Sequence, residues 1–429
     1  MAQLAERHET LATGFEALKR DPVFGRGELA EARQAAFGHF LAKGFPTTRD
    51  EEWRYTNVAP IAALGVSPAP VRTVDAAVAG ALQPGSPTDA SILFVNGRLS
   101  GPLPALPAGI TVRTIRDASG AALLPKRPED ATIFADLNTA LFEDILVIEV
   151  AAGAIVTAPI QVLFLSVADG SPVIVSPRLV IEAGETSQAT VIETYADASP
   201  DGVALVNAVT DVNLASGAVV DHVKLQRQSP ASFHVASMFV RLGRSATFTS
   251  HAITLGGRIA RNDISAVLDG EGAECTLNGL YVGTGETLVD THTTIDHAKA
   301  HCPSHEVYKG ILAGKAHAVF NGKILVRQDA QKTDAKQTNK ALLLTDEAQI
   351  NTKPQLEIFA DDVKCTHGAA IGQLDEDALF YLKARGIGSL EARNMLIHAF
   401  AGDVLNGIRS DAVRSTATFL VDEALGLPA

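Results

Sequence analysis

Two residues of this sequence, Cys365 and His367, have the types and the spacing to do chemistry together. Side chains two positions apart on a β-strand share one face, and at a rise of about 3.3 Å per residue their α-carbons lie roughly 6–7 Å apart. A thiolate and an imidazole that point the same way are ligands suited to iron, zinc or copper. Two ligands do not complete a metal site, so the remaining groups must come from elsewhere or from another chain. From spacing alone, a structural pair is as good an interpretation as a functional pair.

A second group of potential metal ligands lies within fourteen residues, and its members are His292, His297, His301, Cys302 and His305. Their density is compatible with a zinc site, but their spacing matches none of the tight two-ligand clips of structural zinc. Acidic residues nearby offer the histidines hydrogen-bond partners. A polar turn region is therefore the simpler interpretation, and the sequence leaves metal binding by this group open.

Composition, charge and the glycine motifs argue against a nucleic-acid-binding, membrane-binding or nucleotide-binding protein. Hydrophobic residues make up 46% and charged residues 20% of the chain, which is typical of a folded globular protein. The net charge of −13 without a basic cluster argues against nucleic acid or an anionic membrane as a partner. The glycine stretches at 310–316 and 283–285 lack the complete P-loop and dinucleotide-loop patterns, so we expect this chain itself to bind no nucleotide.

The cysteines and the apolar runs indicate where the protein works. Three widely spaced cysteines, including Cys275 in a strand-like segment, argue against a disulfide framework and for a reducing compartment. The N-terminus lacks the pattern of a signal peptide, and no run of 18 or more apolar residues is present. We therefore predict a cytoplasmic protein without a transmembrane helix.

The chain divides into four predicted regions, which are a helical region (1–65), a loop-rich connection (66–144), a β-rich core (145–373) and a C-terminal helical region (374–429). Apolar residues at helical spacing support both ends, with stripes at 29, 32, 36 and 40 and at 397, 400, 404 and 408. From 68 to 128 proline is frequent, and we expect only loops and short strands there.

The core contains short alternating strands that end in similar glycine turns. These turns are centred on Gly153, Gly184, Gly217, Gly243 and Gly272. A strand–turn–strand unit that repeats in this way predicts a β-helix, in which each coil needs its neighbours to bury its apolar face. A β-sandwich with glycine turns is the alternative.

With these residues laid out, the sequence resembles the SufB/SufD family of iron–sulfur cluster assembly scaffolds, on the SufD side. The resemblance is dense from 306 to 387 and sparse elsewhere, and its blocks are EVYKG (306–310), FNGK (320–323), AQKTDA (330–335), NKALLL (339–344), PQLEI (354–358), DDVKCTHG (361–368), LFYL (379–382), RGI (385–387) and, upstream, DEEWRYT (50–56). Chains like SufB usually carry a cysteine where this chain has Leu382, so the sulfur-accepting chemistry of SufB is not expected here.

The resemblance implies a mainly β fold, with a right-handed parallel β-helix core flanked by N-terminal and C-terminal helical regions. It implies a non-enzymatic scaffold subunit that pairs with SufB through the β-helix and docks the SufC ATPase through the C-terminal helices. His367 would face the SufB site where a transient iron–sulfur cluster forms, with Cys365 close by as a second tentative ligand. An isolated chain would be able to form a homodimer through the same edge.

The rival interpretation is a β-helix lyase or hydrolase that acts on polysaccharide. Such enzymes usually bind sugar with exposed aromatic side chains in a groove of paired carboxylates or basic residues. An aromatic content of only 5% and the absence of a signal-peptide pattern argue against this class.

Overall fold

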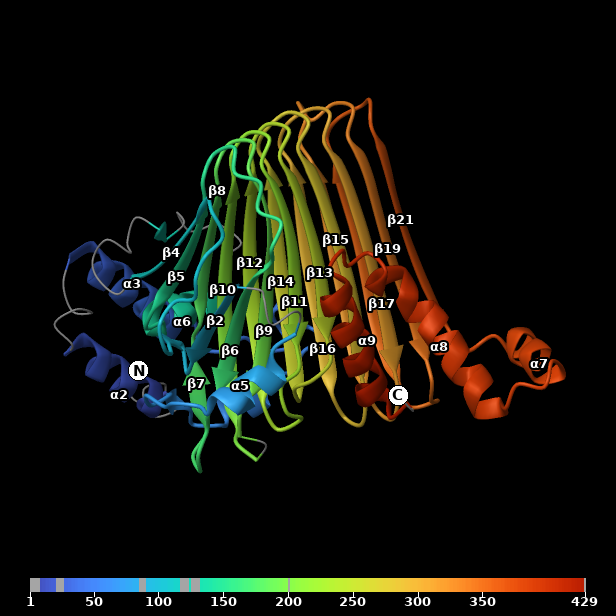
Figure 1. The fold of residues 1–429 in the computed structure, drawn as a ribbon, viewed down its shortest axis with the longest axis horizontal. Helices are drawn as coiled ribbons and strands as arrows, with labels where there is room; N and C mark the ends of the chain where they lie inside the picture. The colour runs from blue at the N-terminus through green and yellow to red at the C-terminus, as the bar shows by residue number, and fades with distance from the viewer. Residues whose placement is uncertain are drawn as a thin grey trace.

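The computed structural model describes residues 8–20, 27–84, 90–115, 123–124, 132–199 and 201–427. Its centre is a parallel β-solenoid, in which the chain winds between two facing sheets (Figure 1). The prediction of a mainly β protein with a parallel β-helix core between two helical regions is therefore confirmed. Parts of the predicted N-terminal helical region and of the loop-rich connection lie outside the described residues.

Strands that are neighbours within a sheet come from successive coils. Sheet A contains β4 (Ile110–Ile115), β5 (Ile145–Val150), β8 (Arg178–Ala183), β10 (Ala204–Leu214), β12 (Phe233–Leu242), β14 (Ile259–Leu268), β16 (Leu288–His297), β18 (His317–Val326) and β20 (Gln349–Ile358), with β7 (Val173–Val175) beside β10 and β1 (Ser67–Pro68) beside β7. Sheet B contains β3 (Arg98–Leu99), β2 (Ala90–Val95), β6 (Ile160–Ser166), β9 (Gln188–Asp197), β11 (Val219–Gln226), β13 (Thr247–Thr254), β15 (Glu274–Gly283), β17 (Pro303–Leu312), β19 (Asp334–Leu343) and β21 (Lys364–Gly372). The sheets therefore end at β20 and β21.

Alternating side chains of both sheets fill the interior of the solenoid, because successive residues of a strand point to opposite faces. Leu277, Tyr308 and Phe320 belong to this continuous interior core. The glycine turns serve the stacking in two ways. Gly217 has a φ of +68°, a conformation that side chains disfavour. A Cβ on Gly243 would lie 2.9 Å from the Leu214 carbonyl of the preceding coil.

The N-terminal elements cover the outer face of sheet A, and they are α2 (Glu9–Lys19), α3 (Gly27–Lys43), the 3₁₀ helix η1 (Glu51–Trp53), α4 (Ala59–Ala62) and α6 (Ile133–Leu141). A further helix, α5 (Ala76–Leu82), packs on β2, β6 and β9 of sheet B. The expectation of only loops and short strands between 68 and 128 was therefore wrong. Helix α5 is capped at its N-terminus by Asp75, whose side chain accepts a hydrogen bond from the Ala77 amide.

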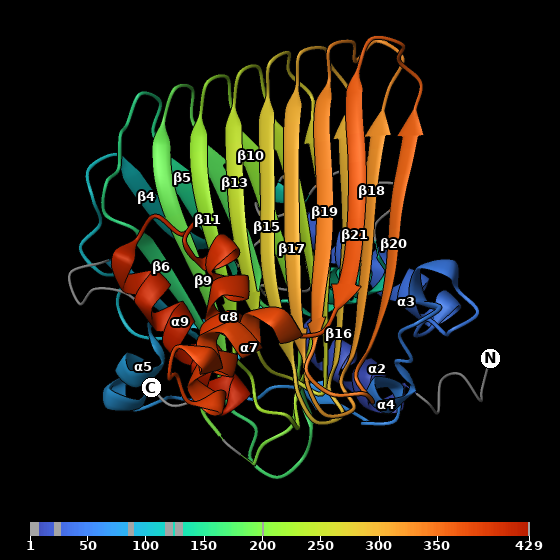
Figure 2. The ribbon, with the colours of Figure 1, turned by 90° about the vertical axis from the view of Figure 1, so that its right-hand side faces the viewer.

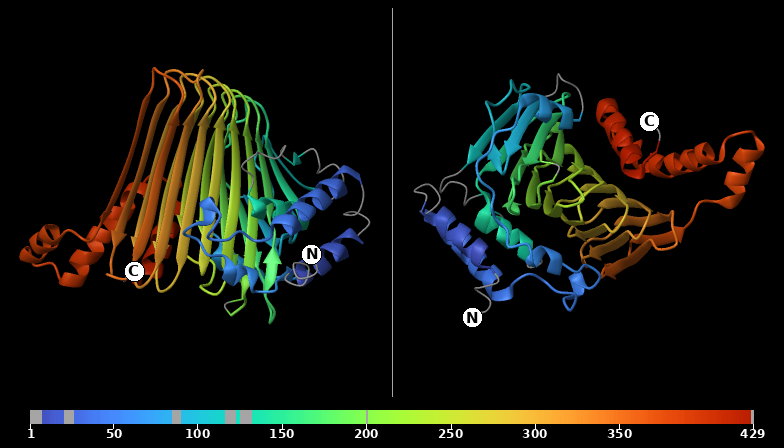
Figure 3. Two further views of the ribbon diagram at one scale, coloured as in Figure 1. Left: turned by 180° about the vertical axis from the view of Figure 1, so that it is seen from behind. Right: turned by 90° about the horizontal axis from the view of Figure 1, so that it is seen from below.

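The C-terminal helices are α7 (Glu376–Ala384), α8 (Ser389–Leu405) and α9 (Asp411–Leu425). Helices α8 and α9 pack on the outer face of sheet B, as Figure 2 shows. Ile397, Val404 and Ile408 of the predicted stripe are buried there, so the stripe belongs to the core of this chain. Helix α7 has no buried residue and extends beyond the last coil (Figure 3). The helices α2, α3, α4 and α6 on sheet A thus lie on the opposite side of the solenoid from α8 and α9 on sheet B.

Candidate functional site

Strand β21 carries the two residues singled out by their spacing. Its register pairs Ala335 with Cys365 and Gln337 with His367. Ala335 and Gln337 are buried in the interior, so Cys365 and His367 face inward on the last coil. Cys365 is half-buried and His367 is exposed, because no further strand follows β21 in sheet B of the described chain. The predicted shared face is thus the interior face of the solenoid at its open end.

The backbone of β21 presents an unpaired edge beside these side chains. The Lys364 amide donates to the carbonyl of Thr333, which directly precedes β19. The backbone N–H and C=O groups of successive residues in a parallel strand point alternately to its two sides. The N–H groups of Cys365, His367, Ala369 and Ile371 therefore point away from β19. Such an edge is a template for pairing with another strand.

The free edge of sheet A, on β20, offers fewer hydrogen-bond donors to a partner strand. The Gln349 amide of β20 donates to Ala316, so the even-numbered residues of this strand direct their backbone groups to the free side. Pro354 stands at one of these positions and has no N–H to donate. Within the described residues, β21 is consequently the better of the two edges for strand addition.

The surroundings of Cys365 set its charge state. The side chain packs against a small apolar cluster at the end of the interior that includes Ile324 and Ala335. This partial burial raises the pKa of the Cys365 thiol, and the nearby charge of Asp334 acts in the same direction. The group is therefore a neutral thiol at neutral pH, and a metal ion would have to displace its proton.

The histidine-rich group at 292–305 does not come together. His297 lies at the end of β16, where its Nε2 is 2.9 Å from the Ser304 hydroxyl. The Cys302 thiol donates to the Gly270 carbonyl, and His301 occupies a turn with a φ of +61°. His305 faces outward on sheet B, while His292 lies on sheet A. Among the described residues, no three histidine, cysteine or acidic side chains are arranged to hold a metal ion.

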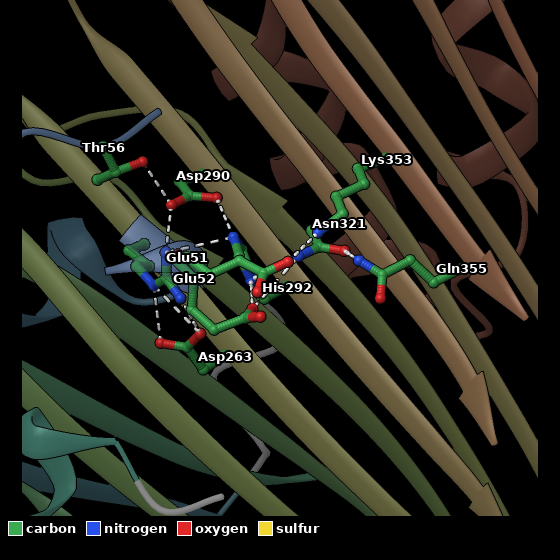
Figure 4. Close-up of polar contacts among 10 residues, drawn as sticks. Glu51, Glu52, Thr56, Asp263, Asp290, His292, Asn321, Lys353 and Gln355 are labelled. Atoms are coloured by element: carbon green, nitrogen blue, oxygen red, sulfur yellow. Dashed lines mark hydrogen bonds and ion pairs between the residues drawn. The ribbon is translucent and has the colours of Figure 1, made fainter. Parts of the chain in front are cut away.

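His292 instead belongs to a network that fastens the segment around η1 to sheet A (Figure 4). Its Nδ1 is 3.1 Å from Glu52, and its Nε2 is 3.0 Å from the buried Asp290. Arg261 donates to Asp290 at 2.6 Å and to the Glu52 carbonyl at 2.8 Å, while Thr56 donates to Asp290 at 2.6 Å. The DEEWRYT block at 50–56 is thus a strap, and its partners lie more than 200 residues away in the sequence.

The charges in this network stabilise one another. Burial opposes the protonation of His292, but the carboxylate of Asp290 and the hydrogen bonds to Asp290 and Glu52 raise its pKa to about 9. Burial would also raise the pKa of Asp290, but the positive charges of Arg261 and His292 hold it far below its usual range. The network is therefore fully ionised at neutral pH.

A cavity of about 370 Å³ lies between the strap and strands β16, β18 and β20. Charged side chains of both signs line it, and some of them pair across it. Lys353 of β20 donates to Glu51 at 2.9 Å, and Asn321 receives a hydrogen bond from Gln355 at 3.2 Å. The strap is thereby connected to β20, the last strand of sheet A at the open end of the solenoid.

Raising the pH should loosen this strap. The pKa of His292 is higher in the folded chain than its ordinary value of 6.5, so its stabilising contribution is complete below that value and is lost as the pH rises through about 9. Trp53, the only tryptophan, is buried beneath Arg261 and reports on the strap. We expect its fluorescence to shift to the red around pH 9 in the native chain. His292→Gln should be shifted already at pH 7, whereas His398→Gln, on α8, should behave like the native chain.

Sequence comparisons relate the chain to a described family. Residues 164–400 match the family described as "SUF system FeS cluster assembly, SufBD core domain". An iron–sulfur cluster assembly SufBD family protein of Synechocystis is 33% identical over 413 residues, which cover 92% of this chain and 91% of the relative. The iron–sulfur cluster assembly protein SufD of Escherichia coli is 33% identical over 400 residues, or 90% of each chain. A chloroplastic protein of Arabidopsis thaliana, ABCI7, is 30% identical over 411 residues, which cover 91% of this chain and 84% of the relative.

Proposed function

The chain belongs to the SufBD family of iron–sulfur cluster assembly proteins, and from this premise we propose that it is a non-enzymatic scaffold subunit that shares its assembly site with a SufB partner. The observation that carries the proposal is the open end of the solenoid. There an unpaired strand edge and two inward-facing potential ligands, Cys365 and His367, occur on the same strand.

Pairing through β21 would continue sheet B into the partner. Main-chain hydrogen bonds along the edge supply affinity in this mode of binding, and side chains on alternating positions supply specificity. The same pairing would cover the interior side chains of the last coil, among which Ile371 is 50% exposed. A repeat protein needs such a cover at its end. A second copy of this chain could supply the cover when SufB is absent.

The cluster is the cargo of such a site. Iron–sulfur clusters are bound by cysteine thiolates and in some proteins by imidazole. Cys365 and His367 would contribute one thiol and one imidazole, and the remaining ligands would come from SufB. An incomplete set on each subunit suits a scaffold, because separation of the two subunits releases the cluster. ATP hydrolysis in an associated SufC would drive that separation as a shift between two arrangements.

The exposed sides of the C-terminal helices α7 and α8 form the proposed SufC surface. Phe380 and Tyr381 of α7 are 74% and 57% exposed, and Leu390 and Met395 of α8 are 65% and 45% exposed. The apolar stripe of α8 itself is occupied by sheet B, so the docking surface must use these other side chains. Nothing in the family match supports the rival interpretation of a polysaccharide enzyme.

A proline at position 369 tests the pairing with SufB. Ala369 directs its N–H to the free edge, so Ala369→Pro removes a donor for the partner and leaves the ladder to β19 intact. A lost hydrogen bond together with an unpaired carbonyl on the partner costs about 1–3 kcal/mol, so we expect binding to be weaker by about fivefold or more. The measurement is copurification of co-expressed SufB. Ala369→Val, which keeps the N–H, is the matched control, and undiminished SufB recovery with the proline variant would contradict pairing through β21.

A further inference from the structure

A row of inward-facing side chains leads from the closed part of the solenoid to its open end. The register of sheet B aligns Leu277 with Glu306, Glu306 with Gln337, and Gln337 with His367. Glu306 and Gln337 are 1% and 2% exposed, so two buried polar side chains lie in the interior directly behind the candidate ligand.

Gln337 is held in one place by its neighbours. Its amide nitrogen donates to a Glu306 carboxylate oxygen at 2.7 Å. On the opposite sheet, Gly322 leaves room for the amide, because a Cβ at that position would lie 2.1 Å from the Gln337 nitrogen. The amide therefore occupies its present position because strand β18 carries a glycine there.

The carbonyl oxygen of the same Gln337 amide is buried and accepts no hydrogen bond in the described part of the chain. A buried acceptor left unpaired costs about 1–3 kcal/mol. The carboxyl group of Glu306 is also costly, since burial raises its pKa to about 7. Packing alone would favour apolar residues at both positions, so these two side chains require another explanation.

We propose that Gln337 is a positioning residue for His367, accepting the ring N–H of the imidazole on its free carbonyl oxygen, and that Glu306 holds the Gln337 amide in the orientation that makes this possible. The inference rests on the proposed function, because it supplies the support that a ligating imidazole needs. A histidine that binds metal through one ring nitrogen generally donates the N–H of the other to a carbonyl or carboxylate. This bond fixes the tautomer and the direction of the ring.

The test uses the full chain with isotope-labelled histidine, in which the His367 signals are identified by their loss in His367→Ala. Gln337→Met, nearly equal in size but without an acceptor, should move the His367 ring-nitrogen shifts to those of a freely exposed imidazole. Glu306→Gln keeps an acceptor for the Gln337 amide and should leave the His367 shifts as in the native chain. Cluster assembly in cells should fall roughly tenfold in Gln337→Met, the usual effect of losing such a support.

Gly322→Ala provides a second route should Gln337→Met fold poorly. Its added methyl displaces the Gln337 amide without removing it, and the His367 shifts should move as they do in Gln337→Met. Unchanged His367 shifts in these two variants, or altered shifts in Glu306→Gln, would overturn the inference. These spectra need no partner, so their outcome is independent of the proposed function, which is tested separately by cluster assembly in His367→Ala and by SufB recovery with Ala369→Pro.

Discussion

Replacing His367 with alanine is expected to abolish or nearly abolish cluster assembly while leaving the protein folded. The side chain is exposed at the open end of the solenoid, so its removal creates no cavity and should change the melting temperature little. The imidazole would nevertheless be lost from a ligand set that is already incomplete on this subunit. The measurement is assembly of iron–sulfur clusters in cells that depend on this chain, beside the melting temperature of the purified complex.

Two matched variants separate this role from a general effect of losing a side chain. His305→Ala removes an imidazole from the outer face of the same sheet and should assemble clusters normally. Cys365→Ala should have a smaller effect than His367→Ala, because partial burial keeps the Cys365 thiol neutral. Normal cluster assembly in His367→Ala would contradict a functional role for this residue. A matching fall in stability and assembly would indicate a structural role instead.

Polar substitution of Phe380 and Tyr381 should release the SufC ATPase from the complex. Both aromatic rings are exposed on α7, a helix without buried residues, so serine at both positions should leave the solenoid intact. An aromatic side chain at the centre of an interface often contributes about 2 kcal/mol or more, so even if only one of the two rings does so, the affinity should fall about thirtyfold. Retention of SufC on the immobilised scaffold is the quantity to measure.

Phe419→Ser is the control for this experiment. Phe419 is 54% exposed on α9, so it is a comparable ring on a different helix, and its loss should leave SufC retention unchanged. Deleting α8 and α9 is a poor alternative, because it would uncover the apolar outer face of sheet B. Equal SufC retention by the α7 double variant and the native chain would place the docking surface elsewhere.

Local periodicity accounts for the parts of the fold that were predicted correctly. The spacing of Ile397, Val404 and Ile408 indicates an apolar helical stripe because the α-helix repeats every 3.6 residues. The repeated glycine turns likewise indicate stacked coils. Periodicity does not say what an apolar face contacts, however. Only the packing of α8 on sheet B decided that this stripe is core and that the exposed rings of α7 remain available.

The candidate site, too, has one feature that local periodicity predicts and others that depend on packing. The sequence alone predicts that Cys365 and His367 share a face, because side chains on a strand alternate with a period of two. The stacking of the coils is what places this face in the interior, at an open end and in register with Gln337 and Glu306. Local patterns do not reveal that register, because it joins coils about thirty residues apart. The contact of Glu52 with His292 joins residues 240 positions apart, a separation at which no local pattern carries a signal.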